Sequence, residues 1–311
     1  MYYIGLDIGG TKCAASLGKI VGDKIEILAR NEVKTLPSAE ETLRGLLPFV
    51  EEYKKTGATE AGISCGGPLD CKKGIILTPP NLPDWHGFPI VDFVKEEFGL
   101  TARLQNDANA CAVAEWRFGA GRGTQNMVFL TFGTGLGAGL ILDGKLYSGT
   151  NDNAGETGHI RLAKNGPVGF GKHGSFEGFC SGGGIARLAE EMAKRCKKIP
   201  ACIEKMGGMS EITTKKLAEA AFNGDAFAKR VFAKSGQMLG KGLSVLIDIL
   251  NPEKIVLGGV FMRSHALLVP AMQKEINKEA LDISAAVCQI VPAELSENIG
   301  DIAALAIAKG V

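Results

Sequence analysis

A short phrase that occurs twice constrains the fold of this 311-residue chain more than any other feature of its sequence. Residues 4–11 read IGLDIGGT, and residues 128–135 read VFLTFGTG. Each copy is an apolar strand, a turn of glycine and threonine, and the start of a second apolar strand. After the second copy, an apolar run at 139–142 ends in Asp143-Gly144, a dipeptide typical of β-hairpin turns. The repetition predicts two duplicated domains that face each other across a shared ligand.

The segments around both copies alternate between strand-like and helix-like patterns, which is typical of the α/β class. In the first half, the pattern predicts a helix at 39–55 and strands at 2–8, 13–17, 24–33 and 61–64. The stretch from 147 to 184 is rich in loop residues. Beyond it, the pattern predicts a strand at 254–257 and helices at 185–197, 214–222 and 226–250. A last apolar helix at 301–309 is expected to pack back onto the N-terminal half.

The bulk composition excludes several classes of protein. A chain of 311 residues exceeds the usual size of one hydrophobic core, so two domains are expected. The 35 Lys and Arg residues nearly balance the 34 Asp and Glu residues, so no net field draws the chain to nucleic acid or to anionic lipid. No uncharged apolar run approaches the roughly 20 residues that span a bilayer. The eight cysteines need no disulfides in a chain of this size and no signal peptide precedes the first strand, so we expect a cytoplasmic protein with reduced thiols.

The first phrase places groups that suit a phosphate at the end of a strand. Asp7 supplies a carboxylate, and Gly9 and Gly10 free backbone N–H groups to face an anion. Thr11 and Lys12 add a hydroxyl and an amine. The order Thr-Lys reverses that of a Walker loop, and the turn leads into a strand rather than a helix, so neither a P-loop nor a Rossmann fingerprint fits. The simpler interpretation is a glycine turn that only shapes a hairpin.

Two further glycine turns argue against that simpler interpretation. The second phrase contains Gly133, Thr134 and Gly135, and the strand at 254–257 ends in Gly258-Gly259. Together the three turns resemble the two phosphate loops and the adenosine loop of the actin-like ATPase superfamily of sugar kinases, and specifically of its ROK family (repressor, open reading frame, kinase). The resemblance runs nearly end to end.

This resemblance implies an α/β fold of two actin-like ATPase (ribonuclease H-like) domains with a cleft between them. We expect a smaller N-terminal domain of residues 1–108, completed by a C-terminal helix at 299–311, and a larger C-terminal domain of residues 109–298. The resemblance also implies a homodimer, and ATP with Mg²⁺ as cofactors. Asp7 would orient the water shell of the magnesium ion, which prefers retained waters and few carboxylates.

Asn106 and Asp107 follow a strand-like stretch at 101–105 and begin a helical run at 108–116. On spacing alone, Asp107 is an ordinary helix N-cap, a role worth about 1 kcal/mol. The phrase LQNDANA at 104–110 resembles the segment that carries the general base in the family. The resemblance therefore implies that Asp107 receives the proton of the sugar hydroxyl during phosphoryl transfer.

Other polar residues lie in phrases that resemble the sugar-binding segments of the family. NLPDW at 81–85 resembles a turn whose asparagine binds sugar hydroxyls; alternatively, it is a proline-rich surface turn with a packed tryptophan. AGETGHI at 154–160 resembles the ROK signature, in which the glutamate and the histidine contact the sugar; taken alone, the two are more often a surface pair. The substrate-binding residues that the resemblance implies are Gly67, Asn81, Asn106, Asp107, Glu156, His159 and Glu177.

The sequence departs from the family in the loop before Glu177. Many members carry three cysteines there, which bind a structural zinc together with the histidine, whereas this chain has Val168, Phe170 and Ser175. Without these sulfurs a closed tetrahedral zinc site lacks its ligands, so we predict no structural zinc. One alternative is a rearranged metal site of His159, His173 and Cys180. We expect instead a small apolar cluster that makes the loop rigid, formed by Val168, Phe170 and Phe176.

The resemblance predicts an ATP-dependent hexose kinase, with glucose phosphorylated at its 6-hydroxyl as the leading reaction. N-acetylglucosamine, N-acetylmannosamine, fructose and allose are alternative acceptors, and polyphosphate is an alternative donor. The expected partners are a hexose and ATP, without nucleic acid or membrane. A non-catalytic sugar-binding regulator is a further interpretation. Repressors of the family carry an N-terminal winged helix-turn-helix, whereas this sequence opens on the strand at 2–8.

Overall fold

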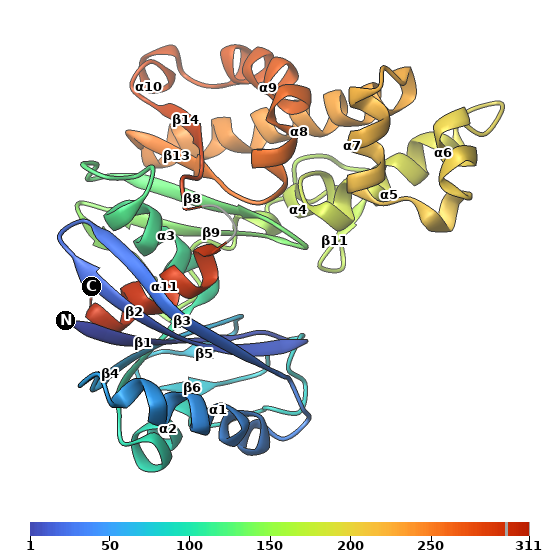
Figure 1. Cartoon of the computed structure of the whole chain (residues 1–311). Coiled ribbons are helices and arrows are strands. Elements are labelled where there is room, and N and C mark those ends of the chain that lie inside the picture. Colours follow the sequence, from blue (N-terminus) through green and yellow to red (C-terminus); the bar gives the residue numbers. More distant parts are fainter. Residues whose placement is uncertain (296–297, 311) are drawn as a thin grey trace. The chain divides into compact units, whose positions relative to one another are not determined.

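A computed structural model describes residues 1–295 and 298–310 of the chain. The chain forms two compact units (Figure 1). The first unit contains Met1–Phe129, Gly139–Gly155 and Ala293–Val311, and the second contains Leu130–Ala138 and Glu156–Pro292. The expected division after residue 108 would place most of helix α3 (Asp107–Phe118) in the larger domain, whereas the compact first unit includes all of it.

The first unit is built on a mixed sheet of five strands, in the order β3-β2-β1-β4-β7. Its strands are β1 (Tyr2–Ile8), β2 (Lys12–Val21), β3 (Lys24–Lys34), β4 (Glu60–Cys65) and β7 (Thr101–Asn106). β1, β2 and β3 form an antiparallel meander, while β4 pairs parallel to β1 and to β7. The strands predicted in this half are confirmed. A small hairpin of β5 (Leu69–Asp70) and β6 (Ile75–Ile76) adds to the unit.

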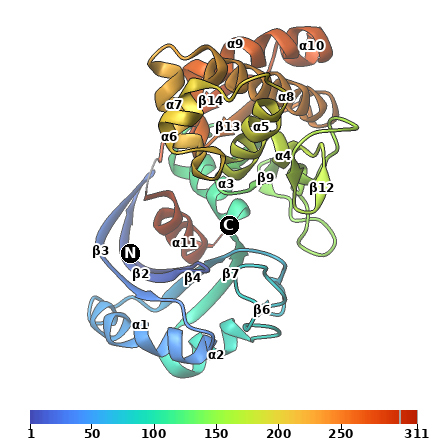
Figure 2. The ribbon, with the colours of Figure 1, turned by 90° about the vertical axis from the view of Figure 1, so that its right-hand side faces the viewer.

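Helices cover both faces of this sheet. Figures 1 and 2 show α1 (Ala39–Lys54) and α2 (Ile90–Phe98) on one face and α11 (Ile299–Lys309) on the other. Successive residues of β1 point to opposite faces, so Ile4 joins the core under α1 and α2 while Tyr3 packs with Leu305 of α11. The last helix therefore packs onto the N-terminal half, as predicted.

Helix α11 approaches the sheet as closely as backbones allow. A Cβ atom added to Gly62 of β4 would lie 2.0 Å from the carbonyl oxygen of Ala304 and 2.4 Å from the nitrogen of Ala308. A Cβ atom at residue 62 therefore fits only if the backbone of α11 shifts away from β4. The small residues of α11 and the glycine of β4 together bring the start of α11 close to the end of β1.

A second five-stranded sheet has the order β10-β9-β8-β13-β14. Its strands are β8 (Met127–Phe132), β9 (Leu136–Leu142), β10 (Lys145–Leu146), β13 (Lys254–Leu257) and β14 (Gln289–Pro292). The predicted hairpin turn joins β9 to β10, with positive φ at both Asp143 (50°) and Gly144 (68°). The bounds of the two units fall within β8 and β9.

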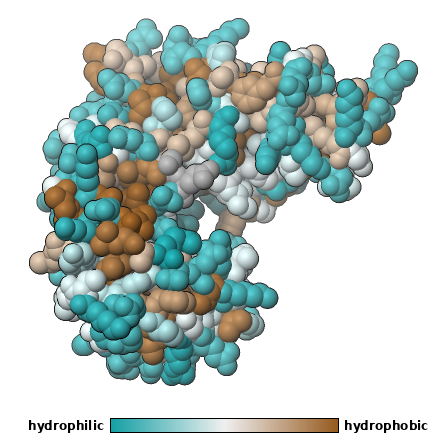
Figure 3. Space-filling model, viewed as in Figure 1, coloured by the Kyte–Doolittle hydropathy of each residue, from teal (hydrophilic) through white to brown (hydrophobic). Residues whose placement is uncertain are grey.

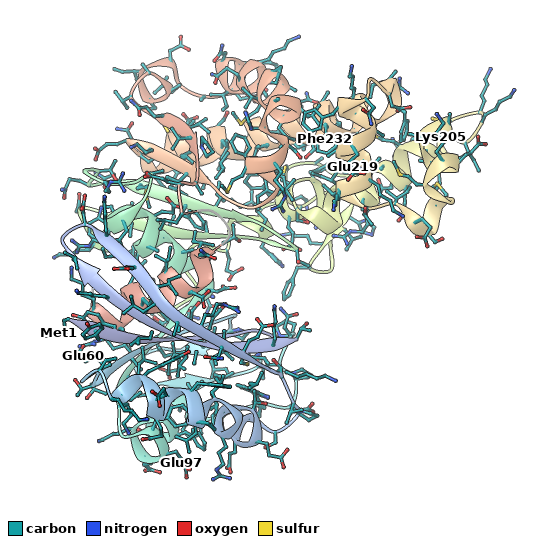
Figure 4. The ribbon with its side chains drawn as sticks, in the orientation of Figure 1. Met1, Glu60, Glu97, Lys205, Glu219 and Phe232 are labelled. Atoms are coloured by element: carbon teal, nitrogen blue, oxygen red, sulfur yellow. The ribbon has the colours of Figure 1, made fainter. Side chains whose placement is uncertain are left out.

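The second unit is mainly helical. Its helices are α4 (Phe176–Phe179), α5 (Gly182–Lys194), α6 (Ala201–Met206), α7 (Thr214–Phe222), α8 (Ala226–Leu250), α9 (Val260–Glu279) and α10 (Asp282–Ala285). α8 ends at Asn251 in the left-handed conformation, before a proline. Phe232 of α8 is buried, whereas Lys205 of α6 and Glu219 of α7 are exposed. Figure 4 labels all three residues.

The loop-rich stretch between 147 and 184 contains three short elements in the second unit besides α4. These are the 3₁₀ turn η1 (Thr157–His159) and the two strands of a hairpin, β11 (Val168–Gly169) and β12 (Lys172–His173). Hydrophilic residues cover much of the surface visible in Figure 3. Within residues 1–295 and 298–310, no helix has the length and apolar character needed to cross a membrane.

Candidate functional site

Asp7 lies one residue before the end of β1, between Ala14 of β2 and Ser64 of β4. Burial raises the pKa of its carboxyl from the ordinary 3.8 to about 6; the carboxylates of Asp301 and Asp107 add to the rise, and Arg30 opposes it. A negative charge here is poorly solvated and lies near other negative charges. The position therefore suits a bound cation.

The start of α11 contributes a second carboxylate beside Asp7. A Cβ atom on Gly300 would lie 2.7 Å from Oδ2 of Asp7, so the helix lies directly against that side chain. Asp301 accepts a hydrogen bond from Nε of Arg30 at 2.8 Å. Its other oxygen, Oδ1, is buried and has no hydrogen-bond partner in the described part of the chain. An orphaned carboxylate oxygen in this place fits a hydrated divalent cation, whose waters would donate to it.

The glycine turn after Asp7 is held from two sides. The hydroxyl of Thr35 donates to the carbonyl oxygen of Gly9 at 2.6 Å. A Cβ atom on Gly10 would lie 2.6 Å from the carbonyl oxygen of Asn81, so the structure brings the first predicted phosphate turn against the predicted sugar-binding turn. Thr11 and Gly10 are exposed, which leaves their backbone accessible to a ligand.

Lys12 does not join this turn. Its ammonium pairs with Glu32 of β3 at 2.9 Å, and Glu32 in turn pairs with Arg30. The salt bridges thus form a chain from Lys12 to Asp301, along the exposed side of β2 and β3. The structure gives Lys12 a carboxylate partner within the protein, and it places Arg30, which the sequence had not singled out, near the predicted site.

The helix N-cap before α3 is Asn106 rather than Asp107. Oδ1 of Asn106 accepts hydrogen bonds from the backbone nitrogens of Ala108 at 3.0 Å and Asn109 at 3.3 Å. Asp107 is the first helical residue, and its Oδ1 accepts from Ala108 at 2.8 Å. The capping interpretation of Asp107, which spacing alone favoured, is therefore wrong.

The carboxyl of Asp107 is open at the surface but crowded by protein atoms. Burial raises its pKa above the ordinary value, while hydrogen bonds from the backbone and from the side chain of Asn106 oppose the rise. The loop after β4 lies beside it, since a Cβ atom on Gly66 would be 4.0 Å from Oδ2 of Asp107 and one on Gly67 would be 3.2 Å from Nδ2 of Asn106. The first unit thus brings together Asp7, Gly9, Gly10 and Asn81 in one group and Gly67, Asn106 and Asp107 in another.

In the second unit, the other two glycine turns lie side by side. The backbone nitrogen of Gly258 donates to the carbonyl oxygen of Leu130 at 3.0 Å. Gly259 has a φ of +60°, and a Cβ atom there would lie 2.1 Å from the carbonyl oxygen of Phe132, so only glycine fits. The turn from Gly133 to Gly135 is closed by a hydrogen bond from the nitrogen of Gly133 to the carbonyl oxygen of Gly135, at 3.0 Å.

Two helices begin at these turns. α9 starts after Gly259, and α5 starts at Gly182, whose nitrogen donates to the carbonyl oxygen of Gly133 at 2.8 Å. Both N-termini carry the positive end of a helix dipole, and such ends bind anions. Sequence reasoning missed Gly182, although the run SGGG at 181–184 was visible and is the signal that would have found it.

The predicted sugar-binding residues of the second unit gather around the same turn. Oε2 of Glu177, in α4, accepts from the backbone nitrogen of Leu136 at 3.0 Å. A Cβ atom on Gly158 would lie 2.1 Å from the carbonyl oxygen of Leu136, so η1 also packs against this strand. Glu156 precedes η1, and its carbonyl oxygen accepts from the nitrogen of His159 at 3.1 Å. Glu177 and the segment from Glu156 to His159 therefore lie close to the second glycine turn.

The loop that lacks the family's cysteines differs from our expectation. The predicted apolar cluster is wrong, because Phe170 is 69% exposed while Phe176 is fully buried and packs against Gly242 of α8. Phe170 has a φ of 45° at the tip of the β11–β12 hairpin, and its ring packs edge-on against His159 rather than in the core.

The three residues of the alternative metal site have separate partners. Sγ of Cys180 donates to the carbonyl oxygen of Ser235 at 3.5 Å within the core, and Nδ1 of His173 lies 3.3 Å from the carbonyl oxygen of Gly166. His159 instead has Lys172 and Phe170 as neighbours. Across residues 1–295 and 298–310, no three His, Cys, Asp or Glu side chains are grouped so that they could hold a metal ion.

Comparisons with known proteins agree on one family. A model of the ROK family matches residues 3–311. The chain is 31% identical to the glucokinase of Thermotoga maritima over 98% of this chain and 96% of the relative. It is 28% identical to the xylose repressor of Caldicellulosiruptor bescii over 89% of this chain and 70% of that one.

A solved structure gives the same result for the fold. The ROK family glucokinase from Streptomyces griseus, in complex with glucose and AMPPNP, matches this chain with a TM-score of 0.81 at 32% identity. That match covers 100% of both chains. The protein therefore belongs to the ROK family and has the actin-like ATPase fold of the family's sugar kinases.

Proposed function

We propose that this protein is an ATP-dependent hexose kinase, with glucose as its leading acceptor and the 6-hydroxyl as the site of transfer. The observation that carries the proposal is the accessibility of the Asp107 carboxylate. Asp107 is exposed beside the Gly66-Gly67 loop, and although its Oδ1 accepts from Ala108, its Oδ2 lies on the side of Gly66 and can accept from a substrate hydroxyl. The likeness to a glucokinase solved with glucose and an ATP analogue supports the same activity.

In the proposed reaction, the sugar hydroxyl oxygen attacks the γ-phosphorus while the bond from that phosphorus to the oxygen of the leaving ADP breaks. The hydroxyl proton passes to Asp107. A carboxyl whose pKa is raised by burial holds that proton better than a fully solvated one. Because the transition state of phosphoryl transfer is loose, the base has mainly to orient the hydroxyl and accept its proton late.

The magnesium ion would lie near Asp7. When bound, it would neutralise charge on the β- and γ-phosphates. Asp7, with its pKa raised by burial, and the unpartnered Oδ1 of Asp301 are the groups of this chain that fit its water shell. Of the glycine turns, Gly9 to Thr11 and Gly133 to Gly135 would bind the phosphates, and Gly258-Gly259 the adenosine.

The sugar would be held by amides, carboxylates and one imidazole, which can each pair with hydroxyls that both donate and accept. Glu177 is well suited, because Leu136 fixes its Oε2 and so orients the carboxylate. Asn106 uses its oxygen for the cap and its side chain also hydrogen-bonds Asp107, so the second N–H of its Nδ2 group would donate to the sugar. Asn81, Glu156 and His159 complete the proposed set. A homodimer remains part of the proposal by family resemblance, to be tested by sedimentation.

Turnover on a panel of sugars tests this function. Glucose, N-acetylglucosamine, N-acetylmannosamine, fructose and allose would each be incubated with Mg-ATP in a coupled assay, with polyphosphate as the second donor. The proposal expects one hexose to exceed the others in kcat/KM. Since relatives include a repressor, sugar binding alone is not sufficient. Binding of a sugar without turnover of any acceptor, with either donor, would favour a regulator and reject the kinase.

A further inference from the structure

Two side chains of the β11–β12 hairpin contact the ring of His159. Nζ of Lys172 donates to the backbone carbonyl oxygen of His159 at 2.7 Å and lies 3.4 Å from Nδ1 of its ring. The ring of Phe170 meets the imidazole nearly edge-on, with the centroids 5.9 Å apart and the planes at 71°. The imidazole itself remains exposed, so a ligand can reach it.

The hairpin has a defined position relative to the proposed sugar-binding residues. Gly169 pairs with Lys172 across the hairpin. A Cβ atom on Gly169 would lie 2.5 Å from the backbone nitrogen of Gly178, so the hairpin is in backbone contact with the helix that carries Glu177. The backbone nitrogen of Phe176, in that helix, donates to the carbonyl oxygen of Ile160, next to His159, at 2.8 Å. These contacts fix the backbone of Lys172, and the hydrogen bond from Nζ to the carbonyl oxygen of His159 fixes the end of its side chain.

The chemistry of the two side chains restricts how they pair. A lysine ammonium has three donors and no acceptor, whereas a neutral imidazole carries its single ring proton on either nitrogen. A hydrogen bond from Nζ to Nδ1 requires Nδ1 to be the acceptor, which leaves the proton on Nε2. We propose that Lys172 is a positioning residue that holds His159 in the Nε2–H tautomer, so that the ring presents a donor to the ligand. Phe170 limits the rotation of the ring.

The inference deepens the proposed function and rests on it only in naming a sugar as the ligand of His159. An Nε2–H group pairs with an acceptor, such as a hydroxyl oxygen or the carbonyl oxygen of an N-acetyl group. Without Lys172, His159 would populate both tautomers. The Nδ1–H form turns a lone pair on Nε2 toward the ligand, so a hydrogen bond to an acceptor oxygen is lost. Lys172 thus affects sugar binding without touching the sugar.

The test uses Lys172→Met, which removes the ammonium but keeps an unbranched side chain. Lys164→Met is the matched control, since Lys164 is an exposed lysine a few residues before the hairpin. Long-range ¹H–¹⁵N spectra of the full chain at about pH 8.5, where ordinary imidazoles are neutral, report the tautomer of each histidine. His159→Asn identifies the His159 signals among the four histidines. The parent and Lys164→Met should show a protonated Nε2 at His159, and Lys172→Met should show a mixture of tautomers.

Kinetics give a second readout. In Lys172→Met, the KM for the sugar should rise about twofold, because only about half of the protein then carries the binding-competent tautomer, while kcat and the KM for ATP stay unchanged. Should Lys172→Met fail to fold, Lys172→Gln, whose amide can still donate, should fold and keep the parent tautomer.

The outcomes separate this inference from the proposed function. A parent protein with the proton on Nδ1, or a Lys172→Met variant with the parent's tautomer, would overturn the inference even if the kinase activity is found. If no sugar is phosphorylated but Lys172→Met shows a mixture of His159 tautomers, the inference about Lys172 holds and the proposed function fails.

Discussion

Replacement of Asp7 by asparagine is expected to stabilise the first unit at neutral pH, although it removes a residue of the proposed active site. Burial raises the pKa of Asp7 from 3.8 to about 6, so the folded protein must hold a poorly solvated carboxylate. Below about pH 3 the carboxyl is mostly protonated in both folded and unfolded chains. Between about pH 4 and pH 6 the unfolded chain loses its proton first, so the folded state binds more protons and its stability falls as the pH rises.

The structure sets the size of this effect. A rise in pKa from 3.8 to about 6 corresponds to about 3 kcal/mol of unfavourable free energy once the carboxyl is ionised. The side chain is only partly buried, so screening by solvent reduces the expected value to about 2 kcal/mol. Asp7→Asn lacks the ionisable group. Its advantage in free energy of unfolding over the parent should therefore grow from near zero at about pH 3 to about 2 kcal/mol above about pH 7.

Tryptophan fluorescence during urea unfolding measures the difference in free energy of unfolding within the first structural unit. The two tryptophans of the chain, Trp85 and Trp116, are both buried in the first unit. Asp23→Asn, in the exposed turn between β2 and β3, is the control and should not differ from the parent. An Asp7→Asn variant that is no more stable than the parent at neutral pH, or whose advantage does not depend on pH, would refute the reasoning. Mg²⁺ would be omitted, because it would stabilise the parent.

Three further changes have expected results. Gly62→Ala should lower the free energy of unfolding by about 1–3 kcal/mol, because the added Cβ meets the backbone of α11. Gly45→Ala is the control in the same urea titration. Its Cβ reaches only Val33 at 3.6 Å, so it should be neutral or stabilising. Asn106→Ala should lose about 1 kcal/mol with the cap of α3, and Asn106→Asp, which can still cap, should restore it; equal stability of all three would contradict the assignment of the cap. Phe170→Ala should leave the thermal midpoint unchanged, because the ring is 69% exposed, and a large fall would show that the ring packs elsewhere.

Strands and helices whose apolar residues recur at a regular spacing could be predicted from the sequence. The meander of β1 to β3 and the long helix α8 match the predicted ranges within a few residues. The turn at Asp143-Gly144 was readable because two consecutive residues with positive φ strongly restrict the residue types. In each case the signal lies within a few neighbouring residues.

The errors occurred where the local sequence permits several structures. Asn106 and Asp107 are both good N-caps, and only the hydrogen bonds to Ala108 and Asn109 assign the role to Asn106. The prediction of an apolar cluster at Val168, Phe170 and Phe176 used only the type of each residue and not the direction of its side chain. Phe170 lies at the tip of a hairpin and its ring is exposed, which its hydrophobicity alone does not indicate.

Other features depend on contacts between residues far apart in the chain. The ion pair of Arg30 with Asp301 joins two elements separated by 271 residues, and it lies beside Asp7. The hydrogen bond from Gly182 to Gly133 brings a helix N-terminus to the second glycine turn. Single residues at such distances carry no periodic signal, so sequence reasoning had no means of pairing them.

The most direct test of the account is the turnover rate of Asp107→Asn with the best hexose and saturating Mg-ATP. The amide keeps the shape of the side chain but cannot take the hydroxyl proton, so kcat should fall by about 10²–10⁴-fold. Sugar affinity measured by calorimetry should stay within a few-fold of the parent. An Asp107→Asn variant that phosphorylates the sugar as fast as the parent would contradict the assignment of Asp107 as the base, and with it the proposed mechanism.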